Sequence, residues 1–129
     1  MEFPEELRYS KSHEWVRLRG NKAACGITDY AQHELSDIVY VELPDIGTEV
    51  KAGEQCAVVE SVKIAEDIYA PLSGAVTKIN TELDGAPERV NTDPYRAGWF
   101  FEIDMSNPAE ADALMSADEY KALTEAEEH

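Results

Sequence analysis

The sequence predicts a mainly β protein, a small sandwich or flattened barrel with helical appendages. Strand-like runs dominate the chain, and glycines and prolines separate them. Helix signals are confined to a short stretch after Thr28 and to the C-terminal tail. With 129 residues, 43% of them hydrophobic, the chain can form a modest core. We expect a single domain over residues 1–129, with a core at about 7–103 and a helical segment at about 107–127.

The charge balance excludes two classes of partner. Eleven basic residues against 27 acidic ones give a net charge of −16, whereas binding of nucleic acid or of an anionic membrane requires a basic surface. No apolar run approaches the length of a membrane span, and the N-terminus lacks the features of a signal or transit peptide. We therefore expect a cytoplasmic protein in which Cys25 and Cys56 are buried free thiols rather than a disulfide.

The first half of the chain predicts three strands and a short helix. Residues 13–19 alternate between apolar and polar positions, and Gly20 with Asn21 forms a suitable turn into a returning strand at 23–27. Thr28 is a suitable N-cap for a helix through Leu35. A β-branched strand at 37–44 follows and ends at proline.

The middle of the chain predicts a β-hairpin around Lys63. Strand-like runs lie on both sides of this lysine, although no Asn-Gly or Asp-Gly pair marks the turn. An exposed hairpin tip on a rigid base can present an amine to a modifying enzyme. On this pattern alone, a lysine that only solvates the surface is the commoner case.

The second half predicts further strands and a helical tail. Residues 75–80 form a strand, 81–87 a loop, 91–95 a turn and 98–103 an apolar strand. In the tail, Asn107 is the expected N-cap ahead of Pro108, and Ser116 begins a capping box. The residues expected to dock the tail are Leu114, Met115, Tyr120 and Leu123.

The segment around Lys63 resembles the lipoyl-lysine segment of the glycine cleavage system H proteins. Residues 60–63 read Glu-Ser-Val-Lys, and Ala65, Asp67, Tyr-Ala-Pro at 69–71 and Ser-Gly at 73–74 follow. Gly47 lies sixteen residues before Lys63 and Gly74 eleven after it, a spacing similar to that of lipoyl and biotinyl domains. Other blocks resemble the family in the same order, at 9–15, 26–32 and 37–44 and at Asn91, Pro94, Tyr95, Gly98 and Trp99.

This resemblance implies a lipoyl/biotinyl-type β sandwich, a flattened hybrid barrel, that carries lipoate as an amide on Lys63. The chain would be a carrier in glycine catabolism and one-carbon metabolism rather than an enzyme, because the cofactor performs the chemistry. The resemblance implies that the lipoamide accepts an aminomethyl group from glycine decarboxylase and delivers it to the aminomethyltransferase. Dihydrolipoamide dehydrogenase then reoxidises it, and a lipoyl ligase or octanoyltransferase attaches the group.

The resemblance also assigns Ser12, Glu14 and Asp67 to a cleft that shelters the loaded arm. A hydroxyl and carboxylates hold an ammonium-like group by charge-assisted hydrogen bonds. Judged from the residues alone, these are a loop hydroxyl and two solvated acids. The sequence departs from the family at Ile64, where a smaller Ala is common, and at Glu66, where Ser or Thr is usual. Both changes lie beside the attachment site, so a ligase must accept added bulk and charge.

Four alternatives remain open at this point. A biotin carrier usually has methionines beside its lysine, whereas Val62 and Ile64 flank Lys63 here. An H-like protein that relays octanoyl or lipoyl groups in protein lipoylation also needs Lys63, so the sequence does not separate it from the shuttle. An interaction module would leave Lys63 unmodified. An enzyme has little support, because no Gly-x-Ser-x-Gly, metal-ligand cluster or phosphate loop is present.

Overall fold

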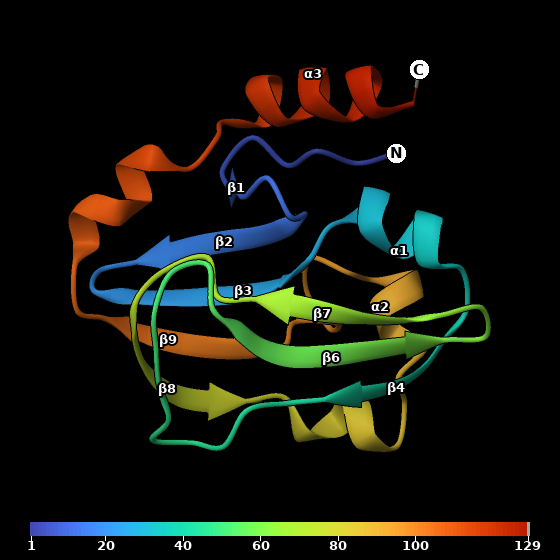
Figure 1. Cartoon of the computed structure of the whole chain (residues 1–129), viewed down its shortest axis with the longest axis horizontal. Coiled ribbons are helices and arrows are strands. Elements are labelled where there is room, and N and C mark those ends of the chain that lie inside the picture. Colours follow the sequence, from blue (N-terminus) through green and yellow to red (C-terminus); the bar gives the residue numbers. More distant parts are fainter. Residues whose placement is uncertain (129) are drawn as a thin grey trace.

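The computed structural model describes residues 1–128 and contains two antiparallel sheets that share one hydrophobic core (Figure 1). The larger sheet contains, in spatial order, β1 (Arg8–Tyr9), β2 (Glu14–Arg19), β3 (Lys22–Ile27), β9 (Phe101–Met105), β8 (Gly74–Ile79) and β5 (Glu49–Val50). The smaller sheet contains β4 (Ile38–Glu42), β6 (Gln55–Ser61) and β7 (Ala65–Tyr69). The helices are α1 (Asp29–Leu35), α2 (Arg89–Thr92), α3 (Ala117–Glu127) and the 3₁₀ helices η1 (Thr81–Asp84) and η2 (Pro108–Ala113). The predicted mainly β sandwich is confirmed, whereas the assignment of residues 1–129 to one domain stays a prediction.

Local signals placed the early elements correctly. Gly20 turns the chain between β2 and β3 with a φ of +58°, which suits glycine. The Thr28 hydroxyl accepts a hydrogen bond from the amide of Ala31, so the predicted N-cap of α1 is confirmed. Both cysteines are free; Cys25 is buried as expected, but Cys56 is only partly buried.

Two predictions for the second half were wrong. Residues 81–87 are not a plain loop, because they contain η1 and lead into α2. Each helix buries one of its own residues, Leu83 in η1 and Val90 in α2. Helices this short do not complete enough turns to show a periodic pattern. The last strand begins at Phe101 rather than at residue 98, since the preceding residues form a turn. Asn107 is the N-cap residue of η2 ahead of Pro108, as predicted, although its side chain makes no capping hydrogen bond.

The C-terminal helix is a packed part of the fold. Ser116 and Glu119 form the predicted capping box at the start of α3. Tyr120 is fully buried and stacks on Tyr9 with ring centroids 4.6 Å apart. Tyr9 also forms a backbone bridge with Met115, so the tail lies along the N-terminal segment (Figure 1).

The glycine that follows the hairpin has a steric explanation. A side chain at Gly74 would place its Cβ 2.1 Å from the carbonyl oxygen of Asp104, where β8 pairs with β9. Only glycine permits this approach of two backbones. Gly74 thereby connects the end of the central hairpin to the larger sheet.

Candidate functional site

Lys63 lies at the tip of the β6–β7 hairpin, as predicted. The amide of Ser61 donates to the carbonyl of Ile64 at 2.8 Å and closes the turn. The Ser61 hydroxyl accepts from the amides of Lys63 and Ile64, both at 3.1 Å. Sequence reasoning missed this role of Ser61, although a serine before a turn is a known signal for such bonds. The hydroxyl therefore satisfies two backbone amides in a turn that has no Asn-Gly pair.

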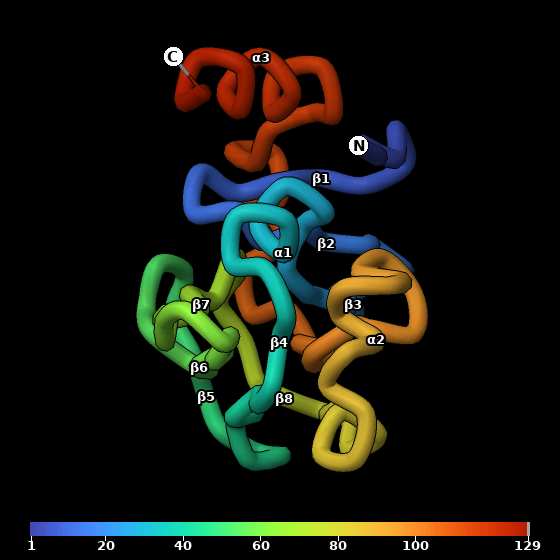
Figure 2. Tube along the Cα trace, turned by 90° about the vertical axis from the view of Figure 1, so that its right-hand side faces the viewer, coloured from blue at the N-terminus to red at the C-terminus, as the bar shows by residue number. Residues whose placement is uncertain are grey.

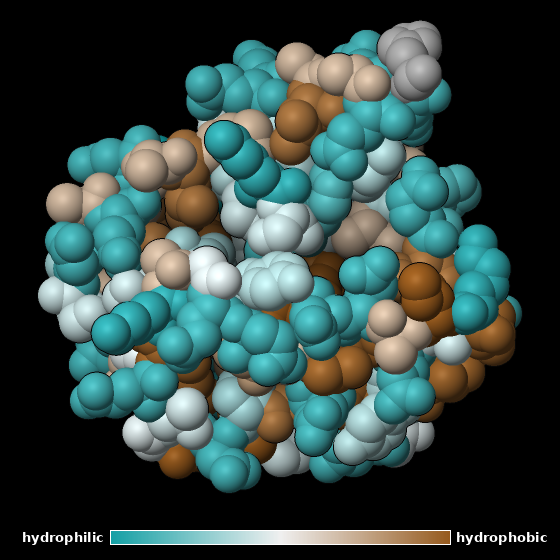
Figure 3. All heavy atoms as spheres, viewed as in Figure 1, coloured by the Kyte–Doolittle hydropathy of each residue, from teal (hydrophilic) through white to brown (hydrophobic). Residues whose placement is uncertain are grey.

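The hairpin turn is fixed to the neighbouring strand, while the side chains at its tip are exposed. The amide of Val62 donates to the carbonyl of Asp37 at 3.0 Å and ties the turn to β4. Lys63 is exposed, and within residues 1–128 its amine forms no ion pair. Val62 and Ile64 are 64% and 51% exposed. Figure 3 shows apolar side chains at the end of the molecule where this turn lies.

A cleft of about 400 Å³ adjoins the hairpin tip. Its walls come from α1, from β7 and the turn before it, from the loop between β1 and β2, and from the end of α3. Figure 2 shows α1 next to the β6–β7 hairpin, with α3 above both. Ser12 and Asp67 line this cleft, so the structure brings two of the three predicted residues together.

The same cleft has a strongly acidic lining. None of the lining residues within the described chain is Lys or Arg, so the local field favours a cation. From the sequence, Glu66 was noted only as a departure from the family pattern. Glu34 and Glu127 were not predicted to belong to a site. The lining acids besides Asp67 are Glu34, Glu66 and Glu127.

Glu14 lies behind the cleft wall and is only 1% exposed. Its Oε1 accepts from the hydroxyls of Ser10 and Ser12, each at 2.5 Å, and its Oε2 accepts from the amide of Tyr69 at 3.3 Å. Burial raises the pKa of the Glu14 carboxyl, while these hydrogen bonds act in the opposite direction. Glu14 therefore joins the loop of Ser12 to β7, rather than being solvated.

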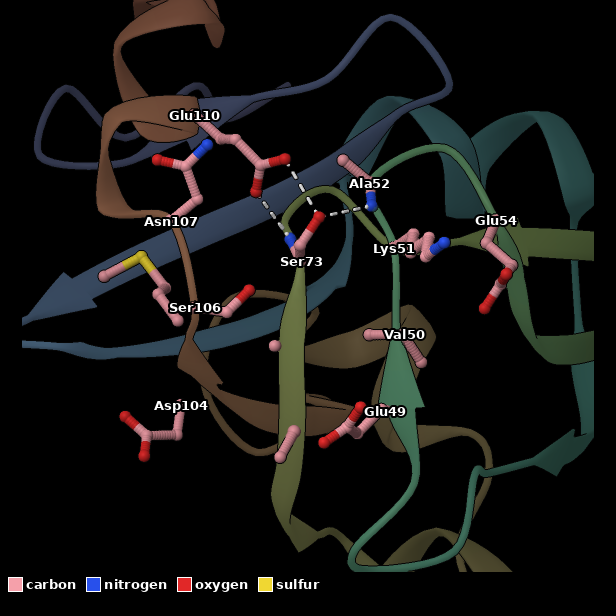
Figure 4. A pocket seen from close by; sticks show the side chains of 13 residues that line it. Glu49, Val50, Lys51, Ala52, Glu54, Ser73, Asp104, Ser106, Asn107 and Glu110 are labelled. Carbon is pink, nitrogen blue, oxygen red and sulfur yellow. Dashed lines mark hydrogen bonds between the residues drawn. The ribbon is translucent and has the colours of Figure 1, made fainter.

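A larger pocket, of about 870 Å³, lies at the other end of the hairpin and is a weaker candidate (Figure 4). Glu110 accepts there from the amide and the hydroxyl of Ser73, at 2.8 and 2.9 Å. The Ser73 hydroxyl accepts in turn from the amide of Ala52 at 3.0 Å. These groups fix η2 against the turn before β8, so their hydrogen-bonding capacity serves the fold.

Two other kinds of site have no counterpart in the part of the chain that the structure describes. No group of three or more His, Cys, Asp or Glu residues there is arranged to hold a metal ion. Across residues 1–128, no helix has the length and apolar character required to cross a membrane.

Comparison with known proteins agrees with the geometry. The family model described as glycine cleavage H-protein matches residues 7–127. A glycine cleavage system H protein of Anaeromyxobacter sp. strain K is 51% identical over 128 residues, which are 99% of this chain and all of that protein. One from Brevibacillus brevis is 52% identical over 95% of this chain and 98% of that protein. The crystal structure of a Mycobacterium marinum glycine cleavage system H protein has a TM-score of 0.87 and 35% identity over 94% of this chain and 98% of that one.

Replacement of the turn hydroxyl should loosen the hairpin tip. In Ser61→Ala the amides of Lys63 and Ile64 lose their acceptor, and we expect their hydrogen exchange to accelerate about fivefold, equivalent to ~1 kcal/mol. Amide exchange measured by NMR provides the test. Ser61→Thr keeps the hydroxyl and is the matched control. Equal protection in Ser61→Ala and wild type would contradict the role of this side chain.

Ionisation of Glu14 should lower the stability of the fold. Burial raises the pKa of Glu14 in the folded state, so ionising this carboxyl costs more free energy in the folded chain than in the unfolded chain. The cost is absent at acid pH, where both states are protonated, and develops as pH rises through the raised pKa. The free energy of unfolding of wild type minus that of Glu14→Gln should therefore fall as the pH rises above about 4.3, the ordinary pKa of a glutamate carboxyl. Urea unfolding measured as a function of pH tests it, and a constant or rising difference would contradict it.

Proposed function

Since the chain belongs to the glycine cleavage H-protein family, we propose that it is the lipoyl-carrying shuttle of a glycine cleavage system, with lipoate attached to Lys63. One observation carries the choice of residue: Lys63 presents an exposed amine, which forms no ion pair within residues 1–128, at the tip of a rigid hairpin. A neutral amine is a good nucleophile toward an activated acyl group, and the amide that forms removes the charge. The acylating enzyme supplies the catalytic groups, so the carrier needs none.

The residues around Lys63 fit a lipoyl group. The turn is held by Ser61 and by the bond from Val62 to Asp37, so the attachment point keeps its direction. A cleft of about 400 Å³ adjoins this point and has apolar as well as acidic lining residues. When bound, the dithiolane of lipoate supplies the redox and group-carrying chemistry. The protein supplies a tether, which raises the effective concentration of the arm at each partner's active site.

The proposed partners follow from the family. They are glycine decarboxylase, which loads an aminomethyl group, the aminomethyltransferase, which removes it, and dihydrolipoamide dehydrogenase. A lipoyl ligase or octanoyltransferase would first modify Lys63. The net charge of −16 supports partners with basic surfaces around their active-site entrances. The cytoplasmic location expected from the sequence stays a prediction.

We assign different tasks to the three predicted cleft residues. Asp67 and Ser12 line the cleft, where a carboxylate and a hydroxyl attract and orient an ammonium-bearing cargo. Glu14 lies behind Ser12 and accepts a hydrogen bond from its hydroxyl, which leaves a lone pair on the Ser12 oxygen available to the cleft. Glu66 adds a negative charge at the same wall, although it stands where the family usually has a neutral residue.

The mass of the intact protein tests the attachment site. Protein expressed in cells supplied with lipoate should gain the mass of one lipoyl amide, and Lys63→Arg should abolish the gain. Lys51→Arg, another exposed lysine outside the hairpin turn, is the matched control and should be modified fully. A biotin-sized gain would place the chain among biotin carriers, and no gain with several ligases would favour an unmodified interaction module. A lipoylated protein that transfers its acyl group to other acceptors would favour the relay.

Retention of the one-carbon cargo tests the shelter. We expect Asp67→Asn to accelerate loss of the cargo to water about fivefold, since it weakens a charge-assisted bond by ~1 kcal/mol. The release of formaldehyde and ammonium from the isolated carrier is the measurement. Asp45→Asn removes an exposed acid outside the cleft and serves as the control. An unchanged rate in Asp67→Asn, and also in Glu14→Ala, would remove the sheltering role from these residues.

A further inference from the structure

His13 occupies a backbone position that favours glycine. It ends the connection between β1 and β2, where the amide of Ser10 donates to the carbonyl of Glu14 at 2.9 Å and so encloses a three-residue loop, 11–13. The amide of His13 donates to the carbonyl of Ser10 at 3.2 Å. Hairpin loops of this length place their last residue in the left-handed region, and His13 has a φ of +73°. A residue with a Cβ is disfavoured there. Glycine would adopt this conformation without strain, so contacts of the His13 side chain must offset the cost.

The imidazole ring is held on three sides by residues distant in the sequence. Nδ1 lies 2.8 Å from the hydroxyl of Tyr120, and Nε2 lies 3.2 Å from a carboxylate oxygen of Glu127, both on α3. The ring also lies against Tyr30 of α1, with centroids 5.0 Å apart. Only a fifth of the His13 side chain is exposed. The loop, α1 and α3 therefore meet at this residue.

The hydrogen bonds at His13 form one directed chain. The hydroxyl of Thr28 accepts from the amide of Ala31 at 3.1 Å and lies 2.6 Å from the hydroxyl of Tyr120. Every donor is used when Thr28 donates to Tyr120, Tyr120 donates to Nδ1 of His13, and the Nε2 proton points to Glu127. Burial raises the pKa of the Tyr120 hydroxyl, which keeps that donor protonated. The N-cap of α1 is thereby linked through α3 to the loop between β1 and β2.

This link reaches the cleft directly. Ser12 and Glu14 flank His13, and Ser12 donates to Glu14 at 2.5 Å. His13 and Glu127 themselves line the cleft, together with Ser12. We propose that His13 is a positioning residue through which α3 holds Ser12 and Glu14 beside the cleft. Its use to the cell rests on the proposed carrier function, but the positioning itself does not require an attached arm.

Amide hydrogen exchange on the unmodified protein tests this positioning. Tyr120→Phe keeps the ring that stacks on Tyr9 and removes only the hydroxyl. His13→Asn tolerates a positive φ but has a shorter side chain. In both variants we expect the loop amides of Ser10, His13 and Glu14 to exchange about fivefold faster than in wild type, the factor for one lost hydrogen bond.

Exchange in the rest of the fold separates positioning from a general loss of stability. Amides in β6, β8 and β9 should keep their wild-type rates in both variants. Glu125→Gln alters an exposed acid on α3 that has no partner within the described residues, and it should leave the loop unchanged. Unchanged loop exchange in Tyr120→Phe and His13→Asn would overturn the proposal, as would a uniform acceleration throughout the sheets.

A second measurement uses the lipoylated protein. After reduction of the arm, its thiols should react severalfold faster with an alkylating reagent in Tyr120→Phe than in wild type, because the cleft wall is looser. Equal alkylation rates would overturn the link between α3 and the cleft. Absence of a lipoyl amide on Lys63 would contradict the proposed function, yet it would leave the result of the exchange experiment intact. The two failures are therefore distinguishable.

Discussion

The pairing of β6 along both of its edges is the constraint on which the site depends. β6 bonds to β4 on one side and to β7 on the other, and it buries Ala57 and Val59 in the core. An isolated two-stranded hairpin is at best marginally stable in water, so a tip carried by β6 and β7 alone would fray. The third strand and the buried valine give the turn a fixed base. A flexible lysine can then be presented in a defined direction.

A buried carboxylate connects this hairpin to the opposite sheet. Glu14 begins β2, yet it accepts from the amide of Tyr69 in β7, which is an edge strand of the smaller sheet. Ionised groups are costly to bury, and the hydroxyls of Ser10 and Ser12 offset part of that cost. The buried Glu14 contributes less to stability than an apolar side chain would, but its hydrogen bonds require defined directions. Glu14 therefore fixes the position of β7 relative to the loop that carries Ser12, which is the geometry that a cleft between them requires.

The sequence predicted those features that depend on neighbours along the chain. The turn at Gly20, the cap at Thr28, the capping box at Ser116 and the hairpin around Lys63 each arise from a few adjacent residues. Features that depend on distant residues had no local signal. The contact of His13 with Tyr120 spans 107 positions, and that of Ser73 with Glu110 spans 37. For the same reason Glu14 was expected at the surface in the absence of a family resemblance, whereas its burial results from the meeting of two sheets.

The position of α3 suggests why an acidic tail belongs to a carrier. α3 is docked by Tyr120 on one side, and its last residue, Glu127, reaches the same cleft as Asp67 of the hairpin. A wall made from three distant segments, the loop of Ser12, β7 and the end of α3, can be adjusted at one of them without altering the core. Because β7 belongs both to the hairpin that carries Lys63 and to the cleft wall, a change in β7 alters both, whereas a change in the loop of Ser12 or at Glu127 alters the wall alone. The wall can therefore change at these two segments while the turn of Lys63 stays fixed, which suits the proposed carrier, whose arm would be exposed to several enzymes and sheltered between them.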